Sequence, residues 1–137
     1  MKVNGKNLTT IWYEGSLDKV NIIDQRLLPH NLKIISLNDL DDAIFAIKEM
    51  QVRGAPLIGV TASFGMYLAS KKSSEIDFLI KSGEALKKTR PTAVNLSWAV
   101  EKIISNIKDL DPNKRKETIL ELSQKIRQED IDSCSKI

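Results

Sequence analysis

The pattern of hydrophobic and polar positions changes near residue 37, and the two sides predict different structures. Before that point, apolar positions come in short runs rich in β-branched and aromatic residues, and turn-forming residues separate the runs. The runs are 8–14, 20–28 and 32–37, with Gly15-Ser16 and Pro29-His30-Asn31 between them. This pattern predicts a small antiparallel sheet. Imperfect alternation in the second run leaves its register open.

From residue 38 onward the apolar positions repeat with the period of an α-helix. The expected helix starts are residues that favour a cap or a first turn, namely Asn38, Pro56, Ser73 or Ser74, Thr92 or Asn95, and Asp111-Pro112. The third helix is expected to end before Pro91. The second is apolar nearly all round, so we expect it to be buried at the centre of the helices.

The sequence therefore predicts an α+β fold in a single domain. A small N-terminal antiparallel β-sheet in residues 1–37 is followed by a bundle of about five helices in residues 38–137. The length of 137 residues, with 42% hydrophobic and 28% charged residues, is typical of one globular unit that buries a core. Because the chain has one cysteine, Cys134, and one histidine, His30, an internal disulfide and a cysteine-rich zinc site are excluded. We expect no metal and no cofactor.

The net charge alone excludes few classes of function, because the 21 basic and 18 acidic residues are interspersed and give a net charge of only +3. Nucleic-acid-binding proteins usually combine a basic stripe with aromatic residues for stacking, and aromatic residues are only 5% of this chain. No stretch reaches the ~20 apolar residues of a membrane helix, and the N-terminus has no apolar signal core. We therefore expect a cytoplasmic protein with neither a nucleic-acid nor a membrane partner.

Two short segments, 52–56 and 89–95, carry the candidate chemistry. Each places an arginine, Arg53 or Arg90, beside small or rigid residues just before a helix start. Unpaired N–H groups and the helix dipole favour an anion there, and planar guanidinium groups suit phosphate oxygens. Gly54 and Ala55 allow a ligand to approach the backbone closely. From spacing alone, however, both segments are also compatible with ordinary helix connections that carry a surface arginine, and neither is a Walker loop or a dinucleotide fingerprint.

These segments read VRGAPLIG at 52–59 and TRPTAVNL at 89–96, and together they resemble the N-terminal motifs of the methylthioribose-1-phosphate isomerase family. That family shares a superfamily with the regulatory subunits of initiation factor 2B and with ribose-1,5-bisphosphate isomerase. Residues 11–13 and 23–29 are similar to the opening strands of the same family, in the same order. The resemblance implies an aldose–ketose isomerase of methionine salvage that is a homodimer. It also implies contacts to the sugar phosphate from Arg53, Gly54, Ala55 and Arg90.

The resemblance covers only the N-terminal part of such enzymes, which are well over twice as long. Their catalytic cysteine, in a Thr-His-Cys-Asn context, and their catalytic aspartate lie in a C-terminal Rossmann-like domain that we expect to be absent here. Cys134 is flanked by serines and does not match, so no catalytic residue is assigned. We expect a domain that binds sugar phosphate and is inactive alone, with a second copy or a complementary C-terminal chain as partner. The sequence leaves open whether this chain is an enzyme.

Two alternatives remain from the sequence. One is a related ribose-1,5-bisphosphate isomerase, and the other is a non-catalytic regulatory module of the initiation factor 2B type. Asp24 and Glu14 are candidate acids that we interpret as structural or solvated, and His30 as a surface turn residue. Trp12, Tyr13 and Trp98 are interpreted as core residues, although Trp98 could also cover the two arginine segments.

Overall fold

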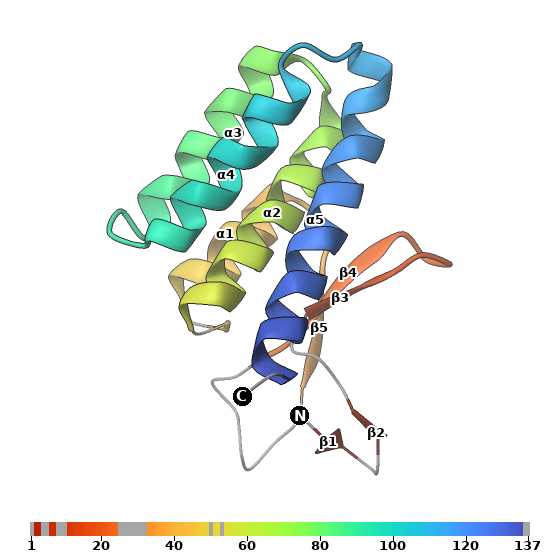
Figure 1. Ribbon diagram of the computed structural model, residues 1–137, viewed down its shortest axis with the longest axis vertical. Coiled ribbons are helices and arrows are strands. Elements are labelled where there is room, and N and C mark those ends of the chain that lie inside the picture. The colour runs from red at the N-terminus through yellow and green to blue at the C-terminus, as the bar shows by residue number, and fades with distance from the viewer. Residues whose placement is uncertain are drawn as a thin grey trace.

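A computed structural model describes residues 2–3, 6–7, 11–24, 33–49, 51–52 and 54–135, which form a small sheet followed by a helical bundle (Figure 1). The predicted α+β fold is confirmed. The strands are β1 (Lys2–Val3), β2 (Lys6–Asn7), β3 (Ile11–Glu14), β4 (Lys19–Ile23) and β5 (Ile34–Leu37). The helices are α1 (Leu40–Lys48), α2 (Ala55–Lys72), α3 (Ile76–Thr89), α4 (Val94–Ile107) and α5 (Pro112–Ser135).

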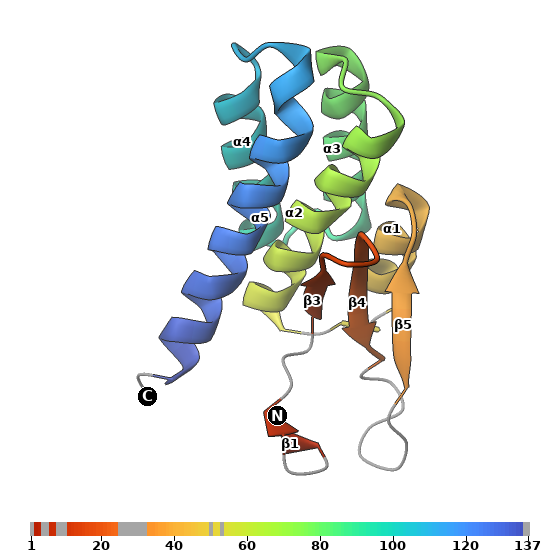
Figure 2. The same cartoon turned by 90° about the vertical axis from the view of Figure 1, so that its right-hand side faces the viewer.

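The main sheet is antiparallel, with the order β3-β4-β5. It packs against α1 and α2, the first two helices of the bundle (Figure 2). In β4, all four residues after Lys19 are buried, which explains why the sequence does not alternate cleanly between apolar and polar positions. Asn21 is the polar member, and it accepts a hydrogen bond of 2.7 Å from the Ser36 hydroxyl on β5. The expected strand residues 8–10, 25–28 and 32, and the expected turn at 29–31 with His30, lie outside the described residues. The short β1–β2 pair was not predicted.

Helix α2 lies at the centre of the bundle, as its apolar sequence predicts. Its residues are buried without a break over 59–70, and it packs against all four other helices. The hydroxyls buried with it are satisfied locally, because Thr61 and Ser70 donate to the carbonyls of Leu57 and Tyr67, respectively. The bundle thus encloses one continuous apolar core around α2.

Some helix starts differ from the expected residues by a few positions. The cap of α1 is Asp39 rather than Asn38: its carboxylate accepts a 2.9 Å hydrogen bond from the N–H of Asp42. The Asp42 carboxylate in turn accepts a hydrogen bond from the N–H of Asn38, so the two side chains cap the turn reciprocally. Helix α3 begins after Glu75, whose N–H donates to the Ser73 hydroxyl. Helix α4 begins at Val94, between the two expected positions.

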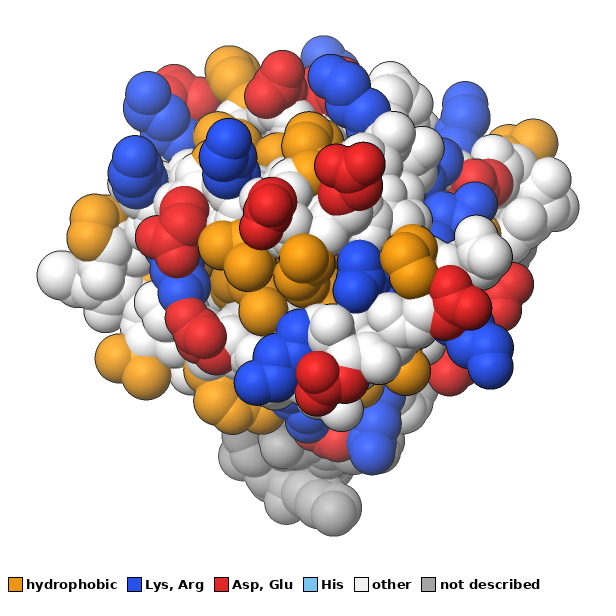
Figure 3. Space-filling view, turned by 90° about the horizontal axis from the view of Figure 1, so that it is seen from above, with side chains coloured by type: hydrophobic (Ala, Val, Ile, Leu, Met, Phe, Trp, Pro, Cys, Tyr) orange, Lys and Arg blue, Asp and Glu red, His pale blue; other side chains and the backbone are white. Residues whose placement is uncertain are grey.

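Positive and negative side chains are interspersed over the face of the molecule seen in Figure 3, with small groups of hydrophobic side chains between them. Among the described residues, no helix is long and apolar enough to cross a membrane. In the same residues, no three or more His, Cys, Asp or Glu side chains lie together so that they could hold a metal ion.

Candidate functional site

The first turns of α2 and α4 meet at one end of the bundle. The two helices lie side by side and begin at the same end (Figure 1). A Cβ atom placed on Gly59 would lie 3.0 Å from the backbone oxygen of Asn95, closer than an ordinary van der Waals contact. Glycine at position 59 therefore allows the backbones to approach. As a result, the positive ends of two helix dipoles act on the same region.

The N-terminus of α2 is open. Gly54 is its N-cap, with φ of 98° and ψ of 133°, a combination that is rare for residues with a side chain. No side chain caps this end, and no acidic residue lies in the first turn. Its two chain neighbours apart, no atom of the described residues lies within 4 Å of the place where a Cβ of Gly54 would be. The turn that leads into α2 thus presents bare backbone. Ala55 is the first helical residue, and Arg53 lies outside the described residues.

Arg90 ends α3 and lies just before α4. One terminal nitrogen of its guanidinium group lies 3.5 Å from the carbonyl oxygen of Ile47, near the end of α1. Its Nε is buried and has no hydrogen-bond partner among the described residues. A buried donor without a partner costs free energy, and a carboxylate or phosphate oxygen would remove that cost. Arg90 is therefore held against the end of α1, just before α4 begins, and its Nε can still donate a hydrogen bond.

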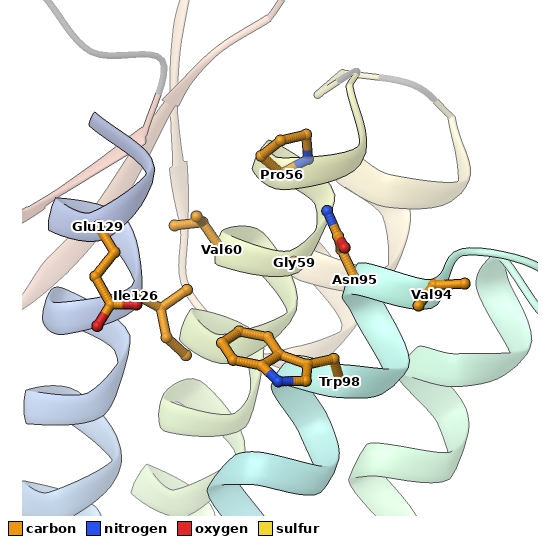
Figure 4. A pocket seen from close by; sticks show the side chains of 8 residues that line it. All are labelled: Pro56, Gly59, Val60, Val94, Asn95, Trp98, Ile126 and Glu129. Carbon is orange, nitrogen blue, oxygen red and sulfur yellow. The ribbon is translucent and has the colours of Figure 1, made fainter. Parts of the chain in front are cut away.

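A pocket of about 430 Å³ opens between α2, α4 and α5 (Figure 4). Its lining is mostly apolar: Pro56, Gly59, Val60, Val94, Asn95, Trp98, Ile126 and Glu129. Trp98 is 48% exposed, so the interpretation of this residue as core was wrong. Its ring lies on the pocket wall, and the ammonium group of Lys102 lies 4.8 Å from the ring centroid. An indole that forms the wall of an open pocket keeps part of its surface in contact with solvent.

The pocket was not anticipated from the sequence. Ile126 and Glu129 come from α5, about seventy positions after α2 begins, and no local pattern links them to the arginine segments. One signal was available in the sequence: Val94 and Trp98 are large apolar residues one turn apart on α4, beside the buried stripe rather than within it. Both side chains are exposed and contribute apolar surface next to the pocket.

The other candidate residues lie elsewhere. Asp24 is 1% exposed at the end of β4, and its carboxylate accepts a 3.4 Å hydrogen bond from Gln51. This contact ties the sheet to the loop that precedes Gly54. Glu14 is half-buried at the end of β3. Tyr13 packs against the core as expected, and Trp12 is half-buried. The side chain of Cys134 lies outside the described residues.

Comparisons with known proteins agree with this architecture. The sequence pattern of the initiation factor 2 subunit family matches residues 51–137. The solved structure of the delta subunit of translation initiation factor eIF-2B from A. fulgidus is similar, with a TM-score of 0.83, 30% identity and 91% of this chain covered. That of 5-methylthioribose 1-phosphate isomerase from Pyrococcus horikoshii has a TM-score of 0.78 and 36% identity over 88% of this chain. These alignments cover 38% and 36% of the two solved chains, respectively.

The fold and the site define a class: a sheet-and-helix domain that presents two helix N-termini and an arginine at one end of its bundle. The chain belongs to the initiation factor 2 subunit family. Methylthioribose-1-phosphate isomerases of Escherichia coli and Methylocella silvestris are 39% and 43% identical to it over all 137 residues. The chain spans 37% of the length of each of these relatives. The resemblance inferred from the two motifs is thereby confirmed.

Proposed function

We propose that this chain is the N-terminal, substrate-binding domain of a sugar-phosphate isomerase. Its ligand is methylthioribose 1-phosphate, which the isomerase interconverts with methylthioribulose 1-phosphate in cytoplasmic methionine salvage. The observation that carries the proposal is the buried Nε of Arg90, which has no hydrogen-bond partner among the described residues. Arg90 lies just before α4, the helix whose first turn packs closely against α2. The names of the relatives support the choice of ligand.

In this proposal the phosphate lies against the first turns of α2 and α4. Backbone N–H groups at a helix start and the dipole behind them stabilise a dianion. Because Gly54 has no Cβ, a phosphate oxygen can approach its backbone closely. Arg90 donates from its planar guanidinium group and stays charged at any physiological pH. The residues assigned to phosphate binding are Arg53, Gly54, Ala55 and Arg90.

Phosphate binding positions the sugar but does not move its hydrogen. An aldose–ketose isomerisation shifts a hydrogen between adjacent carbons and needs an acid–base group, or a dry pocket that protects a hydride shift. Arginine cannot exchange a proton in this role. We therefore propose that a Rossmann-like domain, on the same polypeptide or on a complementary chain, supplies the reacting groups. A homodimer assembled through such domains is part of the proposal.

A titration of the 137-residue chain with methylthioribose 1-phosphate, followed by phosphorus and proton NMR, tests the proposal. We expect saturable binding without conversion to the ketose. Arg90→Ala should weaken binding by about tenfold or more, because it removes a charge-assisted hydrogen bond. Arg90→Lys should recover only part of the loss, since lysine lacks the fork. Lys114→Ala, which removes an exposed charge at the start of α5, is the matched control.

Two outcomes of this titration would contradict the proposal. Conversion by the chain alone would show that it holds the reacting groups, and Cys134 would then need to be tested. If the original chain and Arg90→Ala bind the ligand with equal affinity, the phosphate does not bind at Arg90.

A regulatory module is the second candidate function, and the TM-score of 0.83 with the eIF-2B delta subunit favours it. Under this alternative the chain binds a partner protein stably and does not turn over a sugar phosphate. The same titration separates the two, because a purely regulatory module would give no response to methylthioribose 1-phosphate that depends on Arg90.

A further inference from the structure

Asp24 is a buried carboxyl group to which the phosphate site assigns no role. It follows β4 directly and is 1% exposed. Its backbone N–H donates a 2.9 Å hydrogen bond to the carbonyl oxygen of Lys33, one position beyond the last residue pair of the β4–β5 ladder. The sheet therefore fixes the backbone of Asp24. Burying a carboxyl group costs free energy unless other groups pair with it, so its side-chain contacts indicate what it holds.

The carboxylate of Asp24 holds the segment that leads into α2. Its Oδ2 accepts a 3.4 Å hydrogen bond from Nε2 of Gln51, which is itself only 5% exposed. Gln51 comes three residues before Gly54, the N-cap of α2. The next residue, Val52, is fully buried, and its N–H donates a 3.3 Å hydrogen bond to the carbonyl oxygen of Ala46 in α1. Residues 51 and 52 are thus fixed between the sheet and α1, just before the open helix start.

The same segment is connected to Arg90 through the last turn of α1. The carbonyl oxygen of Ile47, the residue after Ala46, lies 3.5 Å from a terminal nitrogen of the Arg90 guanidinium group. Neighbouring carbonyls of one helix end therefore contact Val52 on one side and Arg90 on the other. Protein interiors are close-packed and transmit displacements. A shift of the buried segment at residues 51 and 52 would consequently move the surface against which Arg90 lies.

We propose that Asp24 is a positioning residue for the phosphate site. Through Gln51 it holds the segment that leads to Gly54, and through the end of α1 it supports Arg90. Groups that bind a ligand need supports that hold them within about 0.5 Å of the productive geometry, so a small shift of either support costs affinity. This role rests on the proposed function, and it adds a residue of the sheet that is distant in sequence from both arginine segments.

The first experiment needs no ligand. The NMR signal of the buried Nε–H of Arg90 is compared between the original chain and two variants, Asp24→Asn and Gln51→Met. We expect both variants to shift this signal, although both substituted positions are distant from Arg90 in sequence. An Arg90 signal that stays in place in both variants would overturn the positioning role, whatever the chain binds. Gln51→Met leaves the carboxylate of Asp24 in place, so it decides the question if Asp24→Asn does not fold.

Ser36→Ala is the matched control, because it breaks another buried contact of the same strand. The Ser36 hydroxyl on β5 donates a 2.7 Å hydrogen bond to the side chain of Asn21, which lies on β4 three residues before Asp24. Asn21 is 7% exposed, so this variant also leaves a buried polar group without a partner. We expect Ser36→Ala to lower the melting temperature but to leave the Arg90 signal in place. An equal shift in Ser36→Ala would mean that any loss of stability in the sheet moves Arg90, which would also overturn the specific role of Asp24.

The second experiment measures the affinity of the folded variants for methylthioribose 1-phosphate. We expect Asp24→Asn and Gln51→Met each to weaken binding by about fivefold, and Ser36→Ala by less than about twofold. The double variant of Asp24 and Gln51 should bind about as weakly as the weaker single variant, because both substitutions disturb one contact. If the two losses multiply instead, Asp24 does not act through Gln51.

Arg90→Ala, measured beside these variants, separates the two ways of failing. If Arg90→Ala weakens binding while Asp24→Asn and Gln51→Met bind like the original chain, the proposed function stands and the positioning role is wrong. If Arg90→Ala binds as tightly as the original chain, the proposed function fails at this site. The ligand-free comparison of the Arg90 signal then still decides whether Asp24 and Gln51 hold that side chain in place.

Discussion

The hydroxyl of Tyr67 donates a 2.6 Å hydrogen bond to Oδ1 of Asp18, which lies 49 residues earlier in the chain. The same oxygen accepts a 2.7 Å hydrogen bond from Tyr13, and Lys71 lies 3.0 Å from Oδ2. Asp18 adopts a φ of 50° in the β3–β4 turn. One carboxylate thus fastens the tip of the hairpin to the C-terminal half of α2, which is the helix that carries the candidate site at its other end.

This contact makes stability depend on pH. Hydrogen bonds from Tyr67 and then Tyr13 lower the pKa of Asp18 to about 2, below the usual value of about 4. Because the folded-state pKa is the lower one, the stabilisation is fully present above about pH 4 and is lost as the pH falls towards 2. Asp18→Asn, which tolerates the same backbone conformation, should cost on the order of 1 kcal/mol near neutral pH and little near pH 2.

Urea unfolding at about pH 7 and about pH 3 measures this difference. Asp109→Asn, an exposed carboxyl in the loop between α4 and α5, is the control. At about pH 3 roughly half of the loss should remain, because a carboxyl with a pKa of about 2 is still mostly ionised there. Equal losses of stability for Asp18→Asn at both pH values would show that the carboxylate charge is not what holds the turn.

Arg115 holds together the far end of the bundle. It is 7% exposed and donates to the carbonyl oxygens of Ile107, Ser74 and Lys108 at 3.0, 2.8 and 3.2 Å. Two of these carbonyls lie at the end of α4, where a positive charge is favoured. Arg115→Met should lower the free energy of unfolding by about 2–4 kcal/mol, because the carbonyls lose a charged donor inside the protein.

Urea unfolding also tests this prediction, with Lys114→Met at the exposed neighbouring position as control. The site at the opposite end of the bundle should keep its ligand affinity in the folded Arg115→Met protein. A loss of stability no larger than that of Lys114→Met would mean that solvent replaces the three hydrogen bonds.

Gly59 is expected to tolerate no side chain. A methyl group at this position would lie 3.0 Å from the backbone oxygen of Asn95, which cannot rotate away as a side chain can. Gly59→Ala should therefore cost about 1–3 kcal/mol by forcing α2 and α4 apart, and it should weaken phosphate binding as well. Gly15→Ala, where the nearest atom is 3.8 Å away, should cost much less in a thermal melt. Similar losses for both variants would argue against close backbone packing.

The helical half was the part of the fold best predicted from sequence, for a physical reason. The spacing of apolar residues along the chain predicts which segments form helices and which side of each helix is buried. Helix α2 is apolar nearly all round, and it is buried without a break over 59–70. The cap of α1 was misplaced by one residue because neighbouring Asn38 and Asp39 are both good caps, and only the reciprocal contact with Asp42 decides between them.

The candidate site could be predicted only where it is local. Gly54 and Arg90 belong to contiguous segments, so the sequence alone could single them out as candidates for an anion site, which stays a prediction. The pocket depends on how α5 packs beside α2 and α4, and the side chains that α5 contributes, Ile126 and Glu129, look like ordinary positions on an amphipathic helix. Tertiary packing decides such a surface, and so Trp98 was assigned to the core when nearly half of it is exposed.

Substitution of Gly54 should change both the stability of the fold and the affinity for the ligand, and the two effects can be measured separately. Its φ of 98° and ψ of 133° disfavour any residue with a Cβ. Yet, beyond its two chain neighbours, no atom in the described part of the chain lies within 4 Å of where that Cβ would be. Gly54→Ala should therefore cost about 1–3 kcal/mol through the backbone alone, without a steric clash. It should also weaken binding of methylthioribose 1-phosphate by about tenfold, because the relaxed turn no longer presents its bare backbone. Thermal melts and the NMR titration measure the two effects on one sample. A stable Gly54→Ala protein with unchanged affinity would show that neither the unusual turn nor the open helix start takes part in binding.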